Sequence, residues 1–395
     1  MRVLVLNPGS SSLKSSVIET VTIPAPDAGG MVPNVAAESL APLGQLDLDW
    51  GVDATTGGDP ADDIRALLDR YEAAGIQPAS LSGVGYRVVH GGATFRQPVR
   101  VTAEVIERVT ALRDLAPLHN GMAAETMKAG LAAIPHLPHV AVFDTAFHAT
   151  LPPEAYRYPV PEQWYREWGV RRYGFHGSSV AWSAERAAAI LARPVGDLRI
   201  VVAHLGSGCS VTAVDGGRSV ATSMGLTPLE GLMMGTRAGS IDPGILFYLL
   251  RTARLDADEL AEQLDHESGL VGVSGRTSDV RELLRLEAAG DEAAALALEL
   301  FVRRAGECIA AVATALPALD AIAFTGGIGE NAAGLRARIV ARLGSVGVAP
   351  IPDLAPAEDA VLSASGSSPA VLRIVAREDL IVARDVAGAI AAMRG

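Results

Sequence analysis

Short apolar runs that end in polar, glycine-containing turns recur along the chain and alternate with helical patterns, which predicts a succession of strands and helices. The first run, Val3 to Leu6, leads into Asn-Pro-Gly-Ser-Ser-Ser, and extended character resumes from Leu13 to Ile18. This pattern predicts a buried strand, a polar turn and a second strand. Apolar residues at helical spacing then follow Asp59, and Gly75 stands where that helix should end.

Three later apolar runs end in residues that can carry chemistry. The run from Val84 to Val89 contains a single arginine, Arg87, and ends in His-Gly-Gly, while the run from Val140 to Phe143 ends in Asp144. Ala321 to Thr325 leads into a glycine-rich loop and a helix, a junction that suits an adenosine or a phosphate. Because ligands bind at the carboxyl ends of strands in α/β sheets, we expect Asp144 to belong to a site.

The segment from Arg199 to Val214 can be laid over Arg2 to Val17, with Gly206 falling on Gly9 and Val214 on Val17. Identity is low, but both segments have the pattern of strand, small polar turn and strand. Two such hairpins facing each other would hold the phosphates of a nucleotide from two domains. The alternative is a coincidence between two ordinary hairpins.

Capping residues suggest further element boundaries. Asp242 and Pro243 are expected to start a helix. Its core face is expected to carry Ile245, Leu246, Leu249 and Leu250. Asn120 and Asn331 are each placed to cap the helix that follows. The span 152–168 holds four prolines and many aromatic residues, which is typical of a loop or lid packed by its own side chains.

Composition narrows the class of protein. The chain has 395 residues, 49% of them hydrophobic and 20% charged, enough for about two well-packed domains. A formal net charge of -12 and the absence of any Lys/Arg block argue against nucleic acid and anionic membrane surfaces as partners. Two cysteines without metal-ligand spacing indicate neither a disulfide framework nor a zinc site. With no signal peptide pattern and no long apolar run, we expect a cytoplasmic protein.

An acidic chain that binds an anion must concentrate its few cations and exposed amides locally. The turn after Asn7 can cradle a phosphate, with Lys14 adding a positive charge, or it can be a plain polar hairpin turn. Arg87 and Arg237 are candidate forks for a carboxylate or phosphate; the alternative for Arg87 is a cation paired on a sheet face. His176, between two glycines, is either a site residue or a hydrogen-bonded loop histidine.

Two weaker features remain open or are set aside. Glu378 and Asp379 stand at a strand-helix junction, where they could complement the helix N-terminus or meet a metal. Gly327-x-Gly329-x-x-Ala332 fits the loose dinucleotide-binding pattern. That fold needs an acidic residue about 20 positions further on, and residues 345–352 offer none. We therefore set the dinucleotide interpretation aside.

Taken together, these segments resemble the acetate kinases of the acetate and sugar kinase, Hsc70 and actin superfamily. The stretches that carry the resemblance occur in family order along the whole chain: 4–14, 86–92, 116–120, 142–148, 171–177, 204–208, 223–243, 272–281, 324–331 and 378–385. The resemblance implies an α/β fold of two duplicated ribonuclease H-like (actin-like ATPase) domains with the active site in the interdomain cleft. The expected domains are 1–150, completed by the helix at about 378–395, and 151–377.

The resemblance also implies a homodimer that transfers a phosphoryl group reversibly between ATP and acetate, giving ADP and acetyl phosphate, with Mg²⁺ or alternatively Mn²⁺. By this match Arg87 binds the carboxylate, His176 and Arg237 stabilise the transferring group, and Asp144 is the active-site carboxylate. Acetate is already ionised, so Asp144 is better read as positioning substrate or metal than as a general base.

The remaining site residues follow from the same match. Asn7 and Glu378 would hold the metal. The nucleotide site would be lined by Ser10, Ser12, Lys14, His204, Leu205, Gly206, Ser207, Gly208, Asp279, Val280, Arg281, Gly327, Ile328, Gly329, Glu330 and Asn331. The pocket for the acyl methyl group would be lined by Val89, Leu118, Phe175 and Pro228.

Three positions depart from the family pattern: Ser207 replaces the usual asparagine, Val180 a common histidine, and Ser240 the usual acidic residue. The first leaves nucleotide affinity open. A propionate or butyrate kinase would differ only in the volume around Val89 and Phe175, because one methylene is worth about 1–3 kcal/mol in such a pocket. A non-catalytic nucleotide switch of the actin type would have no need for Arg87 and Arg237 together.

Overall fold

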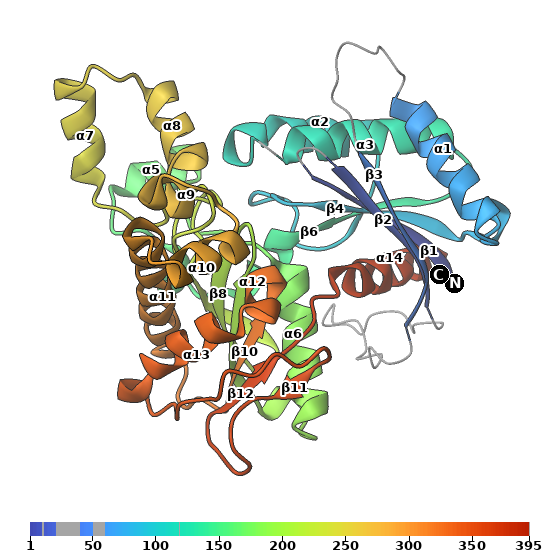
Figure 1. Cartoon of the computed structure of the whole chain (residues 1–395). Coiled ribbons are helices and arrows are strands. Elements are labelled where there is room, and N and C mark those ends of the chain that lie inside the picture. Colours follow the sequence, from blue (N-terminus) through green and yellow to red (C-terminus); the bar gives the residue numbers. More distant parts are fainter. Residues whose placement is uncertain (10–11, 21–39, 50–59, 118, 395) are drawn as a thin grey trace. The chain divides into compact units, whose positions relative to one another are not determined.

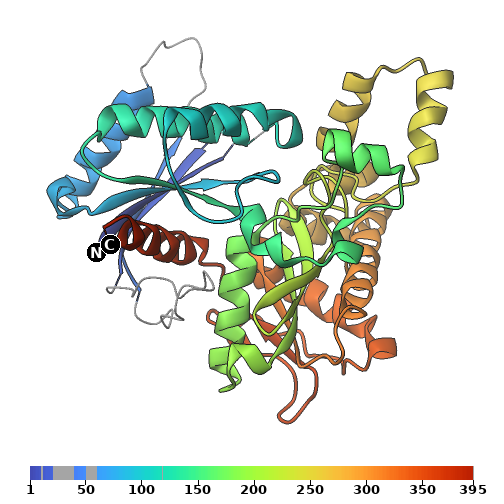
Figure 2. The same ribbon diagram turned by 180° about the vertical axis from the view of Figure 1, so that it is seen from behind.

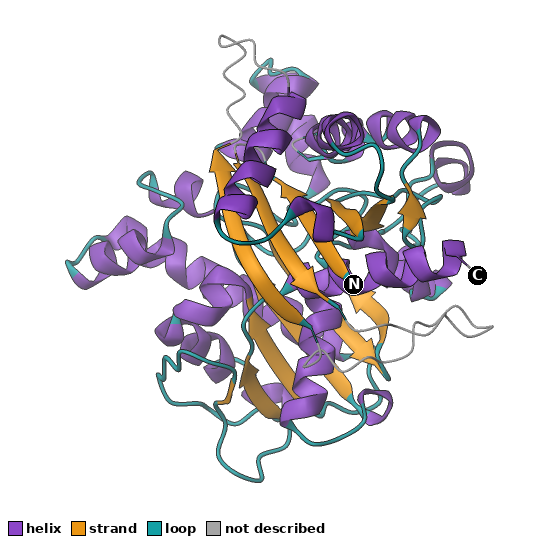
Figure 3. Ribbon diagram, turned by 90° about the vertical axis from the view of Figure 1, so that its right-hand side faces the viewer, coloured by secondary structure: helices purple, strands orange, loops and turns teal. Residues whose placement is uncertain are grey.

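The computed structural model describes residues 1–9, 12–20, 40–49, 60–117 and 119–394. The chain divides into two compact units (Figure 1). The first unit comprises Met1–Ala149, Phe175–Trp182 and Arg377–Gly395, and the second comprises Thr150–Gly174 and Ser183–Ala376. In each unit helices lie on both sides of a mixed sheet (Figure 3), so both units have the α/β architecture.

The sheet of the first unit has six strands in the order β3-β2-β1-β4-β6-β5. Their bounds are β1 Arg2–Pro8, β2 Ser12–Glu19, β3 Ala41–Asp49, β4 Gly83–Val88, β5 Val99–Arg100 and β6 His139–Phe143. The first three strands are antiparallel, β4 and β6 run parallel to β1, and β5 is antiparallel to β6. The predicted hairpin at the start of the chain is therefore confirmed.

Helices cover both faces of this sheet. Helices α1 (Pro60–Ala73), α2 (Ala103–Ala111) and α3 (Asn120–Ala133) lie on one face, and α14 (Glu378–Arg394) lies on the other (Figures 1 and 2). Short 3-10 turns occupy Pro78–Ser80, Arg113–Leu115 and Asp144–Thr150. The predicted helix after Asp59 is confirmed, and Gly75 follows its end with a positive φ of 88°.

The alternation of glycine and larger residues along β4 explains how α14 can pack closely on the sheet. Side chains in a strand point alternately to the two faces. Val84, Tyr86 and Val88 join the core beneath α1 and α3. Gly83 and Gly85 point the other way, and a Cβ at either position would clash with Ile390 or Val386 of α14. The glycines therefore let α14 pack directly on β4, and Arg87, next on that face, points to the side of α14.

The sheet of the second unit has the order β11-β12-β10-β7-β8-β9. Its strands are β7 Arg199–Leu205, β8 Cys209–Asp215, β9 Arg218–Thr222, β10 Ala321–Thr325, β11 Ala360–Val361 and β12 Ala370–Arg373. The three strands β7 to β9 are antiparallel, β10 and β12 are parallel to β7, and β11 is antiparallel to β12.

The second unit also contains most of the helices. They are α4 Pro153–Tyr156, α5 Glu162–Trp168, α7 Pro243–Thr252, α8 Ala257–His266, α9 Gly269–Ser274, α10 Val280–Ala288, α11 Glu292–Ala313, α12 Gly326–Asn331 and α13 Ala333–Ala341. Helix α6 (Gly177–Ile190) enters this unit at Ser183, and 3-10 turns occupy Val195–Asp197 and Gly344–Val346. Among the described residues, no helix is both long and apolar enough to cross a membrane.

The two sheets repeat one topology strand for strand, from β1 to β6 and from β7 to β12. The predicted overlay holds for the first strands, because Arg2–Pro8 and Arg199–Leu205 have equal lengths and equivalent neighbours. It is one residue off in the second strands: Leu4 pairs with Val17, whereas Val201 pairs with Ala213 rather than Val214. The second hairpin has the shorter turn.

Three of the predicted local features are wrong. Helix α7 begins after Asp242 as predicted, but none of its residues is buried. Asn120 is the first residue of α3, where its side chain bonds the backbone of His90 instead of capping the helix. Asn331 ends α12 and bonds back to the Gly327 carbonyl. A partner 30 positions away decided the outcome for Asn120, a carbonyl in its own helix decided it for Asn331, and no described element covers α7.

Gly130 offers a test of the packing of α3 on β4. A Cβ at this position would lie 1.9 Å from the hydroxyl of Tyr86, which is itself fixed by a 2.7 Å bond to His139 Nδ1. We expect Gly130→Ala to destabilise the protein by about 1–3 kcal/mol, because the helix must move off the strand. The measurement is the thermal unfolding midpoint followed by circular dichroism.

The matched control is Gly121→Ala in the same helix. No atom lies within 4 Å of a Cβ placed there. Alanine is the better helix former by up to about 1 kcal/mol, so this variant should unfold at the wild-type temperature or slightly above it. Equal midpoints for the two variants would contradict the packing described here.

Candidate active site

The carboxyl ends of β1, β4 and β6 bring together the first group of predicted site residues. The register pairs Leu6 with Tyr86 and Arg87 with Val142, so Asn7 and Arg87 are neighbours at the strand ends, and Asp144 follows directly after β6, in the 3-10 turn Asp144–Thr150. The Arg87 guanidinium grips the Asp144 carboxylate in a fork, with Nε 3.0 Å from Oδ1 and Nη2 2.7 Å from Oδ2. Such bidentate pairing fixes both side chains.

Glu378 completes this group from the first turn of α14. Its Oε2 lies 2.7 Å from Arg87 Nη1, and Asn7 Oδ1 lies 3.5 Å from the same nitrogen. Burial acts to lower the pKa of Arg87, but the facing carboxylates of Asp144 and Glu378 raise it above its ordinary value. The guanidinium is thus permanently charged, and its side chain is only 15% exposed.

These oxygens form a donor set that suits a hard divalent cation. Asn7 and Glu378 contribute an amide and a carboxylate oxygen, and both already face one cationic atom, Arg87 Nη1. The described part of the chain contains no cluster of three or more His, Cys, Asp or Glu placed to hold a metal. The amide oxygen of Asn7 and the carboxylate of Glu378 are nevertheless ligand types that Mg²⁺ accepts, since this ion usually keeps several waters and takes one or two carboxylates together with substrate phosphates.

His176 stands next to this group in the first unit. It has a φ of 57°, which is uncommon for a residue other than glycine, and it precedes α6. At Gly177 a Cβ would lie 2.0 Å from the Asp144 carbonyl, so only glycine allows this approach. Such backbone geometry is often found where a side chain must be held in one orientation.

His148, which sequence reasoning missed, holds the residue before His176. Its Nε2 donates to the Phe175 carbonyl at 2.9 Å, and its side chain is buried. Burial lowers the pKa of His148 to about 4, although its bond to Phe175 and the charge of Asp144 act in the opposite direction. The imidazole is therefore neutral near pH 7. A histidine four residues after a strand-end aspartate gave no sequence signal beyond its residue type.

The second unit gathers the predicted nucleotide residues around two glycine turns. Strand β10 runs beside β7, with Thr325 opposite His204. The turn after β7 and the loop after β10 are therefore neighbours: a Cβ at Gly206 would lie 3.9 Å from the Gly327 amide nitrogen. At Gly326, with φ 78°, a Cβ would lie 2.8 Å from the Leu205 carbonyl. Backbone amides exposed in such turns can receive an anion.

The segments that carry Ser207 and Asp279 lie on either side of Gly235. A Cβ at Gly235 would lie 3.3 Å from Ser278, the residue before Asp279, and 3.9 Å from the Ser207 carbonyl. Asp279 caps α10 by accepting from the Arg281 amide, and it also pairs with the Arg281 guanidinium at 2.7 Å. Hydrogen bonds from Arg281 lower the pKa of Asp279 to about 2. The pair is solvent-exposed.

Arg237 has donors that no described carboxylate occupies. Its Nη1 donates to the Pro228 carbonyl at 3.0 Å, and no ion pair joins it to a carboxylate among the described residues. Burial lowers the pKa of Arg237, although nearby Asp265 acts to raise it. A partly buried guanidinium without a counter-ion is poised to receive an anion.

The loop that holds Pro228 is fixed by a cluster the sequence did not reveal. Arg172 donates to the Ser223 carbonyl at 2.8 Å and pairs with Glu230 at 2.7 Å. Tyr158 bonds the same glutamate and accepts from the Leu226 amide. These contacts join the span 152–168, which contains the short helices α4 and α5, and the neighbouring Arg172 to the segment 223–230.

Several predicted residues are not brought together or cannot be placed. Ser10 and Leu118 lie outside the described residues, and of Ser12 only the backbone is described. Lys14 is exposed opposite Asn7 in the hairpin. Val89 and Phe175 belong to the first unit, whereas Pro228 belongs to the second. The acyl pocket therefore remains a prediction.

Cationic side chains at strand ends and glycine turns that can receive an anion are groups that phosphoryl-transfer enzymes use, because this reaction depends on positioning and charge stabilisation. Comparison with known proteins narrows the class. The profile of the acetokinase family matches residues 2–384. An acetate kinase of Deinococcus radiodurans is 46% identical over 395 residues, covering 98% of both chains. The chain belongs to the acetokinase family.

Solved structures agree with this assignment. A propionate kinase of Francisella tularensis superposes with a TM-score of 0.83 at 35% identity, covering 97% of this chain and 98% of that one. An acetate kinase of Porphyromonas gingivalis superposes with a TM-score of 0.81 at 32% identity, covering 98% and 99%. The predicted family and α/β fold are confirmed.

The depressed pKa of His148 predicts a pH dependence of stability. An unfolded histidine titrates near pH 6.5, whereas His148 stays neutral down to about pH 4 in the folded protein. The unfolded chain therefore binds this proton first, and the contribution to stability, present above pH 6.5, is lost as the pH falls toward 4. The loss should approach about 3 kcal/mol.

His148→Gln isolates this effect, because glutamine can still donate to the Phe175 carbonyl but does not titrate. The measurement is the urea midpoint at several pH values between 4.5 and 7. We expect a smaller loss of stability toward acid in the variant than in the wild type. Identical pH profiles would show that His148 does not carry the dependence.

Proposed function

We propose that this protein is an acetate kinase that transfers a phosphoryl group reversibly from ATP to acetate, giving ADP and acetyl phosphate. The observation that carries the proposal is the Arg87 fork at the end of β4, held by Asp144 and Glu378 in a member of the acetokinase family. A carboxylate substrate needs a guanidinium of this kind. We further propose that the enzyme works in the cytoplasm, where ATP is available.

In this proposal the guanidinium of Arg87 binds the acetate carboxylate. Without substrate, its N–H groups face the carboxylates of Asp144 and Glu378. Acetate is ionised near neutral pH, so no general base is needed. Asp144 instead orients Arg87 through the bidentate contact. Phosphoryl transfer spreads negative charge over the equatorial oxygens, and we assign its stabilisation to His176 and Arg237.

Asn7 and Glu378 are the proposed metal ligands, with Mg²⁺ as the ion and Mn²⁺ as an alternative. When bound, the ion would neutralise charge on the nucleotide phosphates. Glu378 contacts Arg87 Nη1 through Oε2, so its second oxygen could hold the ion while that ion pair is kept.

The nucleotide is proposed to lie on the turn His204–Gly208 and on the loop Gly327–Asn331. Two observations support this placement of the nucleotide: Gly206 lies close to Gly327, and Ser207 lies close to Gly235. Lys14, Ser10 and Ser12 from the first hairpin and the Asp279–Arg281 segment complete the proposed set.

Propionate is the second candidate substrate. The specific reason is the propionate kinase of Francisella tularensis, whose fold matches with a TM-score of 0.83. Butyrate stays a third candidate, with Val89, Leu118, Phe175 and Pro228 as the proposed acyl pocket. The non-catalytic switch is disfavoured by membership of a kinase family and by the presence of both Arg87 and Arg237.

An ATP-dependent acyl phosphate assay with acetate, propionate and butyrate tests the function. We expect the highest kcat/KM with acetate. Arg87→Ala should raise the KM for acetate, and Arg237→Ala should lower kcat, each reducing kcat/KM by roughly 10²–10³-fold, as expected for loss of one charge-stabilising donor. Absence of turnover with every acid would refute the kinase assignment.

Arg113→Ala is the matched control for the arginine variants. Arg113 lies on the surface of the first unit with its side chain 70% exposed, so its loss should leave kcat/KM unchanged. Arg87→Lys keeps the charge for Asp144 and Glu378 but not the fork. Wild-type rates in both Arg87→Ala and Arg237→Ala would refute the assignment of the active site but not the kinase activity.

We propose that the protein is a homodimer joined through α7. This helix buries none of its residues and exposes Ile245, Phe247, Tyr248 and Leu250 by 40–65%. In Figure 1 it projects from the body of the second unit (yellow). A contiguous apolar surface of this kind marks an interaction site, and a second copy of the chain is the partner that is always present at equal concentration.

Phe247→Asp tests this interface, since a charge at its centre would have to be desolvated. Light scattering after gel filtration should give twice the 40.9 kDa monomer mass for the wild type and the monomer mass for the variant. Leu354→Asp, at a 52% exposed position outside α7, is the control and should remain dimeric. A monomeric wild type, or a dimeric Phe247→Asp, would contradict the proposal.

A further inference from the structure

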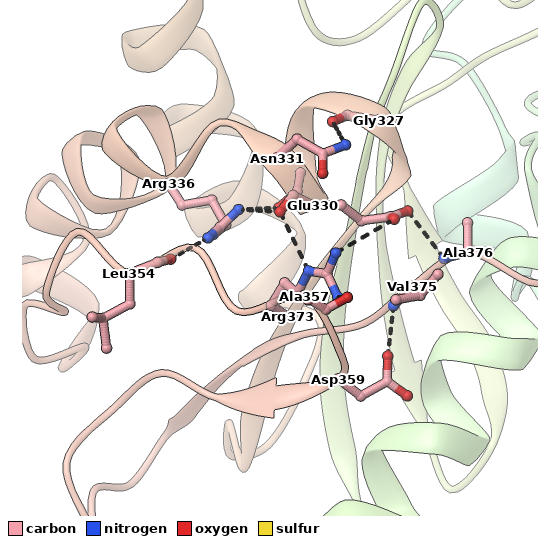
Figure 4. Close-up of polar contacts among 11 residues, drawn as sticks. Gly327, Glu330, Asn331, Arg336, Leu354, Ala357, Asp359, Arg373, Val375 and Ala376 are labelled. Carbon is pink, nitrogen blue, oxygen red and sulfur yellow. Dashed lines mark hydrogen bonds and ion pairs between the residues drawn. The ribbon is translucent and has the colours of Figure 1, made fainter.

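Two buried arginines hold the C-terminal end of α12, the short helix that forms the proposed nucleotide loop (Figure 4). Arg336 is 1% exposed, and its Nη1 donates to the carbonyls of Gly329 and Glu330, both at 2.8 Å. Arg373 is 4% exposed and its Nε donates to the same Glu330 carbonyl at 3.3 Å. Buried guanidinium groups are costly unless they are hydrogen-bonded, so these contacts fix the loop backbone.

The side chain of Glu330 faces the protein rather than the solvent. Its Oε1 accepts from the Ala376 amide at 3.0 Å, and Oε2 lies 3.9 Å from Arg373 Nη2. The carboxylate is 13% exposed. A residue of the glycine-rich loop is therefore bonded to the chain segment that follows β12 (Figure 4).

That segment is held at two successive amides. Strand β12 ends at Arg373, and beyond it the Val375 amide donates to Asp359 Oδ1 at 2.7 Å, while the Ala376 amide donates to Glu330. Asp359 is in turn bonded to Arg186 Nε at 2.5 Å. Beyond the end of β12, side-chain carboxylates therefore accept the backbone hydrogen bonds at Val375 and Ala376 and hold this segment in place.

The path leads directly to a proposed metal ligand. Ala376 is the last residue of the second unit, and Glu378, two residues further on, begins α14. Arg377 folds onto Asp379 at 3.1 Å, which fixes the first turn of that helix. Glu378 thus stands at the start of α14, only two residues along the chain from the amide that Glu330 binds.

We propose that Glu330 is a positioning residue that couples nucleotide binding at Gly327–Asn331 to metal binding at Glu378. This inference rests on the proposed function. A ligand that orders the loop backbone also orders the Glu330 carboxylate, and through the Ala376 amide it restricts the segment that carries Glu378. Each ligand should then tighten the binding of the other, because such coupling is reciprocal.

Adenosine and Mn²⁺ are the probes that test this coupling in the full-length protein. Adenosine carries no phosphate and does not chelate the metal, so any effect on Mn²⁺ affinity passes through the protein. The dissociation constant of Mn²⁺ is measured from the electron paramagnetic resonance signal of the free ion, with and without saturating adenosine. For the wild type we expect adenosine to tighten Mn²⁺ binding by about fivefold or more.

The coupling ratio is the dissociation constant of Mn²⁺ without adenosine divided by that with adenosine. Glu330→Ala should reduce this ratio to about one, because the link to Ala376 is lost. Glu330→Gln should keep an intermediate ratio, because its amide oxygen can still accept from the Ala376 amide. Asp256→Ala is the matched control, because it removes an exposed carboxylate whose contacts are local: it caps α8 by accepting from the Asp258 and Glu259 amides. Its ratio should equal that of the wild type.

The outcomes separate the proposal from the function on which it rests. If adenosine and Mn²⁺ both bind to the wild type but the coupling ratio is one, the coupling role of Glu330 is wrong, although both ligand sites exist. The same conclusion follows if Glu330→Ala keeps the wild-type ratio. If adenosine does not bind at all, the proposed nucleotide site fails and the coupling falls with it. A merely structural Glu330 would lower the thermal midpoint in Glu330→Ala without changing the ratio.

Discussion

A single guanidinium at the end of β4 constrains the first unit more than any other group. Arg87 can be buried only if its donors are satisfied, and the structure meets this need with Asp144 from the end of β6 and Glu378 from the start of α14. Removing one partner of such a pair typically costs about 3–5 kcal/mol, since the other charge is left unpaired. The C-terminal helix is thereby tied to strands from the first half of the chain.

The same topology places different chemical groups at equivalent strand ends of the two units. At equivalent strand ends the first unit carries Asn7 and Arg87, whereas the second carries His204 and Thr325 followed by glycines. Charged side chains therefore gather at one sheet and exposed backbone amides at the other. A guanidinium provides a fork for a carboxylate, whereas glycine turns allow close approach to a phosphate.

Buried arginines and carboxylates in the second unit show how such turns are kept in shape. A short helix has few internal hydrogen bonds, and its last carbonyls need donors. Arg336 and Arg373 supply these to the loop after β10, and Arg172 does the same for the carbonyls around Met224. Arg373 stands in the apolar stretch Val371 to Val375, which was an available signal, whereas Arg172 follows another arginine and its partners lie about 50 positions away.

Sequence reasoning succeeded where the decisive contacts are local. The first hairpin, the end of α1 near Gly75 and the strand bearing Arg87 all follow from the spacing of apolar residues and from glycine. It failed for α7, whose apolar side has no covering element in the described chain, and for Asn120, which bonds the backbone of His90. Amphipathic spacing reveals an apolar side but not what will cover it.

The sequence alone therefore determined the family, the order of strands and turns, and which residue types could recognise a carboxylate or a phosphate. Only the tertiary structure decided which of these residues meet. Parallel register places Asn7, Arg87 and Asp144 at one edge, the glycines of β4 admit α14 and so bring in Glu378, and Glu330 turns inward to Ala376. Such contacts join residues up to hundreds of positions apart, and local spacing carries no information about them.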